Sequence, residues 1–387
     1  MKLSKRGKSI LLYTCTVFSS VILAVLIAEV YFRVTDPAIL LSPAYDYNDE
    51  IGIIPLPDVR MRHSLRGYEP LFYTTNLMRY RGELIPFDEP SKKVVVLGDS
   101  HSFGVGVNDA ETYAYVLDRI LSDFRVVNLA APGWGLSHQI NRFVTMGHRY
   151  RPSIVILQFS ANDPNDNLRE PTVEWNASEN RFVLRRLEPN EFTRVKLLVT
   201  RFRVVFDFLS GHSVLYNKVK HPAYEFFRNL TRGAEASDEE APMIVENPHY
   251  TREGESYYIE LLNQFIDYLR QSDVDVVMLS VQGSLEMFPE IKREILRLDG
   301  EGKLTYLDTN QWFSLEFYNR HDLGPGWTHM WGHLSHKWIA LKLAEWIDGV
   351  HAQGDVDWYE MVRQADLASW CQEHACADSP GGETGGS

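Results

Sequence analysis

The stretch VVVLGDSHSFGVGV, residues 94–107, joins an apolar run to a Gly-Asp-Ser turn and a glycine-containing loop. A short, continuous apolar run is typical of a strand that is buried on both faces, as in a parallel sheet. Ser100 stands where this strand should end. Three roles are open to it: a catalytic nucleophile, the N-cap of a helix, or part of a loop that binds phosphate.

The wider pattern predicts an α/β fold. Strands and helices alternate from residue 92 onward, which indicates a mostly parallel, five-stranded sheet in a three-layer α/β/α sandwich. The strands are predicted at residues 93–98, 125–130, 153–160, 274–283 and 304–308. The helices are predicted from residue 108, from a Ser137 cap, at 256–271 and at 335–347.

Composition limits the classes of function. The chain has 387 residues, 44% of them hydrophobic, and a formal net charge of −13, so it is globular and no nucleic-acid partner is expected. Three cysteines do not make a disulfide scaffold. Cys371 and Cys376 either pair in an oxidising compartment or remain thiols.

The N-terminus predicts a membrane anchor. Residues 1–8 carry four positive charges, and residues 9–32 are long and apolar enough to span a bilayer as a helix. No convincing cleavage site follows, so we expect an uncleaved signal anchor. The positive-inside rule places residues 1–8 in the cytoplasm and the rest of the chain outside it, in the periplasm if the source is bacterial.

The remaining segments are assigned around this core. Residues 33–91 are predicted to be a juxtamembrane segment packed on the domain that follows, which spans residues 92–350. Residues 168–250 break the strand–helix alternation and are expected to form a helical insertion, with a lid or a membrane-contacting surface as alternatives. Residues 351–387 form a tail whose end is expected to be disordered.

In an open parallel sheet, ligands bind at the carboxyl ends of the strands. The first three strands deliver Ser100, Gly133 and Asn162 there, and a histidine-rich loop follows the fifth. Acyl transfer needs a nucleophile, a base and preorganised donors for an oxyanion. The N–H of Ser100, the N–H of Gly133 and the amide of Asn162 could supply those donors.

Other chemistries fit less well. The Ser100 loop lacks the Gly-Lys-[Ser/Thr] of a phosphate-binding loop. Asn108 and Glu111 form a capping-box pattern, so the first clear helix is predicted to begin at Asn108 rather than at Ser100. The late histidines lack upstream partners at metal-ligand spacing, so neither a metal nor another cofactor is expected.

The four blocks VVVLGDSHSFGVGV, NLAAPGWGLSHQ, LQFSANDPNDN and GHLSHKWIALKLAEWI together resemble those of the SGNH, or GDSL-type, hydrolases. The segment TTNLMRYRGE (74–83) is similar to one in membrane-anchored bacterial members. The resemblance implies a flavodoxin-like fold and cleavage of esters without metal. It also implies that Ser100 is the nucleophile, with a late histidine as base and an oxyanion hole of Ser100, Gly133 and Asn162.

One departure concerns the base. The family usually places an aspartate three residues before its histidine, but Met330 precedes His333 at that spacing and Gly326 precedes His329. We prefer His333 as the base, with His329 as its rival. Asp322 is the nearest upstream carboxylate that could orient the ring. Asp308 and a backbone carbonyl are the other candidates.

These observations predict a serine esterase that forms an acyl-enzyme on Ser100. The anchor favours an envelope substrate, such as an O-acetylated polysaccharide, a glycan or a lipid. An O-acyltransferase would keep the same chemistry and pass the acyl group to a sugar hydroxyl. A non-catalytic scaffold that binds glycans or proteins is the alternative of another class, which the missing aspartate supports.

Overall fold

The structure is a computed structural model of the full chain. It describes residues 5–35, 40–41, 45–64, 70–187, 201–220, 251–281, 283–311 and 331–351. The statements below concern these residues.

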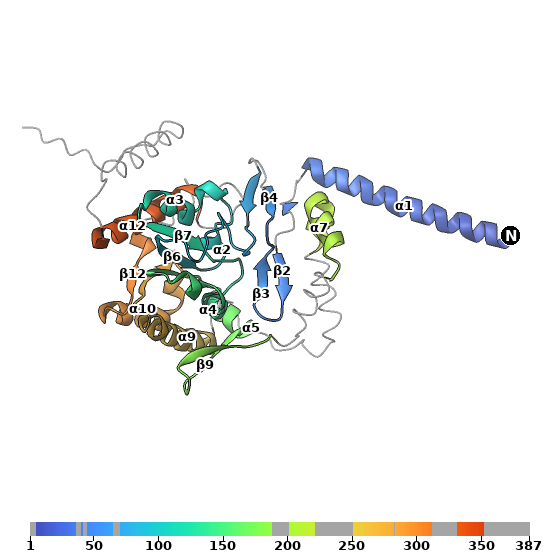
Figure 1. The fold of residues 1–387 in the computed structure, drawn as a ribbon. Coiled ribbons are helices and arrows are strands. Elements are labelled where there is room, and N and C mark those ends of the chain that lie inside the picture. Colours follow the sequence, from blue (N-terminus) through green and yellow to red (C-terminus); the bar gives the residue numbers. More distant parts are fainter. Residues whose placement is uncertain are drawn as a thin grey trace, which may run out of the picture.

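A five-stranded sheet forms the centre of the molecule (Figure 1). Its strands pair in the order β12-β11-β8-β6-β7, and every pairing is parallel. They are β6 (Lys92–Leu97), β7 (Phe124–Asn128), β8 (Ile154–Phe159), β11 (Asp275–Ser280) and β12 (Thr305–Leu307). Counted along the chain this is the flavodoxin-like order 2-1-3-4-5, whose direction of winding reverses between the first and third strands. The predicted α/β fold is confirmed, and the sheet is entirely parallel.

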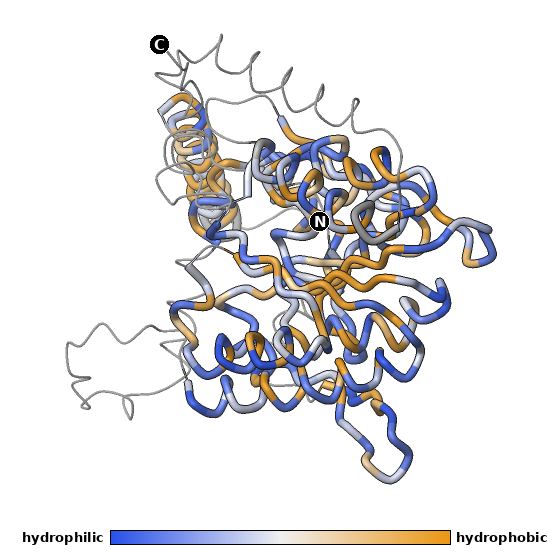
Figure 2. The backbone as a smooth tube through the Cα atoms, turned by 90° about the vertical axis from the view of Figure 1, so that its left-hand side faces the viewer, coloured by the Kyte–Doolittle hydropathy of each residue, from blue (hydrophilic) through white to orange (hydrophobic). Residues whose placement is uncertain are grey.

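Helices cover both faces of the sheet (Figure 1). Val94 and Val96 of β6 pack toward α3 (Tyr113–Ile120) and α12 (His333–His351), whereas Val95 and Leu97 pack toward the opposite layer. That layer consists of α4 (Leu136–Thr145), α9 (Arg252–Arg270) and α10 (Pro289–Gly300). These four β6 side chains are fully buried. Burying each one contributes about 1.5–3 kcal/mol to the free energy of folding. Figure 2 shows the strands as a hydrophobic layer between mixed helices.

Two expected helix starts are wrong. The first helix after β6 is α2 (Ser100–Phe103), which begins at Ser100 rather than at Asn108. The Asn108–Glu111 capping box exists, but it opens a single 3-10 turn, and Thr112 then caps α3. Ser137 does not cap α4, because the N-cap is Gly135 and the Ser137 hydroxyl lies 3.2 Å from that of Thr172.

Short antiparallel strands precede the sheet. They are β1 (Leu40–Leu41), β2 (Tyr45–Asn48), β3 (Gly52–Pro55), β4 (Arg60–Ser64) and β5 (Leu71–Thr74). They lie against the domain that contains the five-stranded sheet: Trp134 donates to the carbonyl of Ile53 at 2.5 Å, and Met61 packs with Phe103. The upstream segment is therefore part of the folded body.

The described part of the 168–250 insertion is not wholly helical. After α5 (Asp163–Arg169), it begins with an antiparallel hairpin of β9 (Val173–Asn176) and β10 (Arg181–Leu184). Then follow α7 (Arg203–His212) and a helical stretch at 214–220. Cys371, Cys376 and the rest of the expected tail after residue 351 lie outside the described residues.

The N-terminal helix α1 (Lys5–Thr35) projects away from the body (Figure 1). Within Leu11–Thr35, an 18-residue stretch has a mean hydropathy of 2.3, and none of that stretch is buried. By length and composition it can cross a membrane.

Candidate active site

A side chain of β8 stabilises the turn that carries Ser100. The side-chain oxygen of Gln158 accepts from the Asp99 N–H and from the Ser102 hydroxyl, both at 3.1 Å. A Cβ on Gly98 would lie 2.5 Å from Ser102 Oγ, so only glycine fits between strand and turn. Ser100, at the top of this turn, is half-buried.

Asp99, not Ser100, is the helix cap. Its Oδ1 accepts from the His101 N–H at 2.8 Å and lies 3.2 Å from His101 Nδ1. The capping role that Ser100 could have filled is therefore taken by its neighbour.

Gly133 and Asn162 follow the strands on either side of β6. Gly133 has φ +79°, a conformation that favours glycine, and nothing lies within 4 Å of the position of a Cβ. Asn162 Nδ2 donates to Asp166 Oδ2 at 2.7 Å. An amide NH₂ has two hydrogens, so one remains for a ligand. Both residues are half-buried, like Ser100, and Asn162 and Ser100 flank the position where the winding reverses.

The start of α12 lies beside the Ser100 turn. The Trp331 ring meets the His101 ring edge-on, with centroids 5.4 Å apart. Tyr113 links the same elements, because its N–H donates to His336 Nδ1 at 3.1 Å and its hydroxyl donates to Ser102 at 2.8 Å. His333 is the exposed first residue of α12, two residues from Trp331.

The other candidates for the base and its orienting acid are placed differently. His329 and Asp322 lie outside the described residues. Asp308 follows β12, with β11 and β8 between that strand and β6. Its carboxylate accepts from the Tyr306 hydroxyl and the Asn310 N–H.

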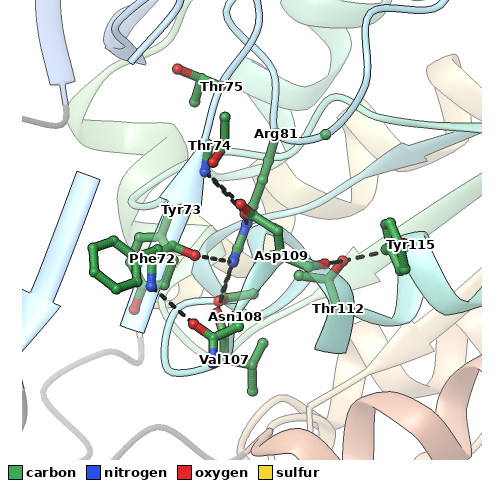
Figure 3. A network of polar contacts seen from close by, with 12 residues as sticks. Phe72, Tyr73, Thr74, Thr75, Arg81, Val107, Asn108, Asp109, Thr112 and Tyr115 are labelled. Carbon is green, nitrogen blue, oxygen red and sulfur yellow. Dashed lines mark hydrogen bonds and ion pairs between the residues drawn. The ribbon is translucent and has the colours of Figure 1, made fainter. Parts of the chain in front are cut away.

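A buried arginine from the upstream segment holds the loop that follows α2 (Figure 3). Arg81 donates to the carbonyls of Phe103 at 2.8 Å, of Gly104 at 2.5 Å and of Val107 at 2.7 Å. It also pairs with Asp109 at 2.8 Å. Its side chain is 2% exposed, so these bonds form away from bulk water. Through Arg81, residues 74–83 thus stabilise the loop that follows the Ser100 helix.

Carboxyl groups under the site are electrostatically unusual. Burial, and secondarily the charge of Asp99, raise the pKa of Asp163 well above its usual range. Its Oδ2 accepts from the Ser160 N–H at 3.2 Å. Burial also raises the pKa of Asp166, against the opposing effect of Arg169. The raised pKa of Asp163 favours its neutral form, which places less negative charge beside Asn162.

Sequence reasoning missed Gln158 and Arg81. Gln158 had a signal, because it is the one polar residue inside the otherwise apolar run IVILQF. Arg81 had none beyond its place in TTNLMRYRGE, since the main-chain carbonyls it binds cannot be read from side-chain types.

Among the described residues, no group of three or more His, Cys, Asp or Glu side chains could hold a metal ion.

No protein-family model and no curated protein matches this chain. Similar solved structures are lipolytic hydrolases and esterases. A putative G-D-S-L family lipolytic protein from Desulfitobacterium hafniense is 12% identical, with a TM-score of 0.38 over 66% of this chain and 99% of that one. A lipase/acylhydrolase from Enterococcus faecalis is 11% identical, with a TM-score of 0.37 over 68% and 100%. An acetylxylan esterase from Geobacillus stearothermophilus is 12% identical, with a TM-score of 0.35 over 68% and 97%.

At these identities and TM-scores the likenesses add no support of their own. The fold assignment rests on the parallel pairing and the strand order described above.

Proposed function

We propose that this protein is a serine esterase with Ser100 as its nucleophile. The observation that supports the proposal is that Ser100, Gly133 and Asn162 each follow the carboxyl end of one of three adjacent parallel strands. Ligands bind at this edge in folds of this type, beside the reversal point of the strand order.

In the proposed reaction, Ser100 Oγ attacks the acyl carbonyl while His333 takes the hydroxyl proton. The tetrahedral oxyanion receives hydrogen bonds from the N–H of Ser100, the N–H of Gly133 and the free hydrogen of Asn162 Nδ2. His333 then protonates the leaving alcohol as the acyl-enzyme forms. Water, deprotonated by His333, releases the acid and restores Ser100. Asp322 remains our candidate for orienting His333.

The substrate class follows from position rather than from a pocket. An anchored domain outside the cytoplasm would meet acylated envelope material, so we propose an O-acetylated polysaccharide, glycan or lipid as substrate. We place the chain in the membrane as a single-pass protein with its N-terminus in the cytoplasm, which the apolar α1 supports.

The first experiment labels the full-length protein in detergent with a serine-directed fluorophosphonate. Wild type and the control variant Ser178→Ala, an exposed hairpin serine, should label. Ser100→Ala should not. A wild type that stays unlabelled, or a Ser100→Ala protein that labels equally, would refute the esterase and favour a scaffold that only binds.

The second experiment measures turnover of an acetyl ester. His333→Ala should lose at least about a hundredfold in kcat. His148→Ala, whose ring contacts a main-chain carbonyl on the opposite helix layer, should keep its activity. If His329→Ala loses the activity instead, the base is reassigned. Running the assay with and without an oligosaccharide acceptor separates hydrolysis from acyl transfer.

A further inference from the structure

Helix α7 turns its apolar side away from the protein. Val204, Val205 and Phe208 are 83%, 57% and 62% exposed, and their spacing places them on one face of the helix. Phe202, just before the helix, is 52% exposed. A surface helix of a protein in water shows the opposite arrangement, with its apolar stripe toward the core.

The polar side of α7 faces the body. Arg203 lies 3.5 Å from Asp207 on the same helix and 4.0 Å from Asp46 of β2. All three side chains are less exposed than the apolar ones opposite. The charged groups thus lie on the body side of α7, together with the half-buried Phe206 and Leu209, and the most exposed apolar side chains form its outer surface.

The end of α7 is tied to α1. Glu29 is an acidic residue in the apolar stretch of α1, and both of its oxygens have partners just after α7. Oε2 accepts from the Ser213 hydroxyl at 2.8 Å and from the Leu215 N–H at 2.9 Å, and Oε1 accepts from the Val214 N–H at 2.9 Å. Arg33 pairs with Glu29 at 2.7 Å and donates to the last carbonyl of α7. A carboxylate at this depth is costly unless it is partnered in this way.

From these contacts we infer that α7 lies in the interface of the bilayer that α1 spans, with Val204, Val205 and Phe208 in the lipid. Glu29 sets the depth by binding the chain that leaves α7. Figure 1 shows α7 beside the body end of α1. The Glu29 bonds fix α7 to the helix that can span a membrane, which is why a lipid surface fits better than a protein partner. The inference concerns attachment and does not depend on the esterase proposal.

The experiment uses the full-length protein with Cys15, Cys371 and Cys376 replaced by serine. Phe208→Cys carries an environment-sensitive NBD fluorophore. Leu296→Cys is the control, because Leu296 is an apolar residue that is 48% exposed but lies on α10 rather than on α7. The proteins are reconstituted in phosphatidylcholine–phosphatidylglycerol vesicles with and without doxyl-labelled lipid. We expect a blue-shifted Phe208 probe that doxyl lipid quenches at least about threefold more than the control, as insertion 5–10 Å into the acyl boundary requires.

A probe at residue 208 that behaves like the control would overturn the inference. So would a probe that is blue-shifted but not quenched by the lipid, because a protein would then cover α7. Val204→Cys tests the same face independently of any local disturbance at Phe208. Adding Glu29→Ala should lower the quenching at residue 208, and unchanged quenching would remove Glu29 from its assigned role.

Discussion

Replacing Arg81 should destabilise the protein strongly. Arg81→Met keeps much of the apolar stem but loses the guanidinium that lies over the Tyr73 ring. It leaves the buried carbonyls of Phe103 and Val107 without their donor, whereas the Gly104 carbonyl keeps the Val107 N–H. Each unsatisfied buried acceptor costs about 1–3 kcal/mol, while removing a buried cation recovers part of its desolvation cost. Asp109 is 32% exposed, so water can solvate it and the lost ion pair adds little. We therefore expect a loss of about 3–5 kcal/mol.

Arg119→Met is the matched control. Arg119 pairs with Glu83 at 2.9 Å, but the two side chains are 51% and 61% exposed, so its loss should cost at most about 1 kcal/mol. The assay is thermal and urea unfolding of the full-length proteins in one detergent. At roughly 2–4 °C per kcal/mol, Arg81→Met should lower Tm by about 6–20 °C. Equal effects of the two substitutions would show that Arg81 does not hold the loop.

Three further changes test the site and its surroundings. Gly133→Ala should cost about 1–2 kcal/mol of stability because of its positive φ, and at least about tenfold in ester turnover; unchanged kinetics would remove Gly133 from the oxyanion hole. Burial lowers the pKa of His63 to about 4, so as the pH falls the unfolded chain binds a proton on this ring before the folded protein does. The free energy of unfolding of wild type should therefore fall by about 3 kcal/mol between pH 6.5 and pH 4. His63→Phe should flatten that slope, measured as Tm against pH, and an equally steep slope would contradict the assignment. The raised pKa of Asp163 has the opposite effect on stability, because the folded state holds this proton more tightly and becomes less stable as the pH rises. In urea titrations, Asp163→Asn should therefore gain stability over wild type as the pH is raised.

The sheet could be predicted because its signals are local. Continuous apolar runs such as residues 94–97 require a strand buried on both faces, and amphipathic stripes between them require helices. Helix starts were harder, because several polar residues compete as caps. Asp99 takes the cap position before Ser100, and Gly135 does so before Ser137, through turns that side-chain types alone do not determine.

The sequence predicted those residues of the candidate site that directly follow a strand, and it did not predict the others. Ser100, Gly133 and Asn162 each follow a strand, so the topology brings them together. Arg81 acts on main-chain carbonyls, and Gln158 acts from inside a strand, so neither is visible in a pattern of strand ends. The assignment of His333 and Asp322 depends on the loop between β12 and α12, where no periodic pattern guides the reading.

The upstream strands also bear on the order of synthesis. They leave the ribosome before the sheet does, yet Ile53 bonds to Trp134, 81 residues later, and Tyr47 bonds to Glu170, 123 residues later. At about 5–20 residues per second, Tyr47 waits roughly 6–25 s for its partner. During that time apolar side chains such as Met61 lack the core that covers them in the folded protein. Productive folding of this protein should therefore depend on a chaperone that shields these upstream strands until the five-stranded sheet has formed.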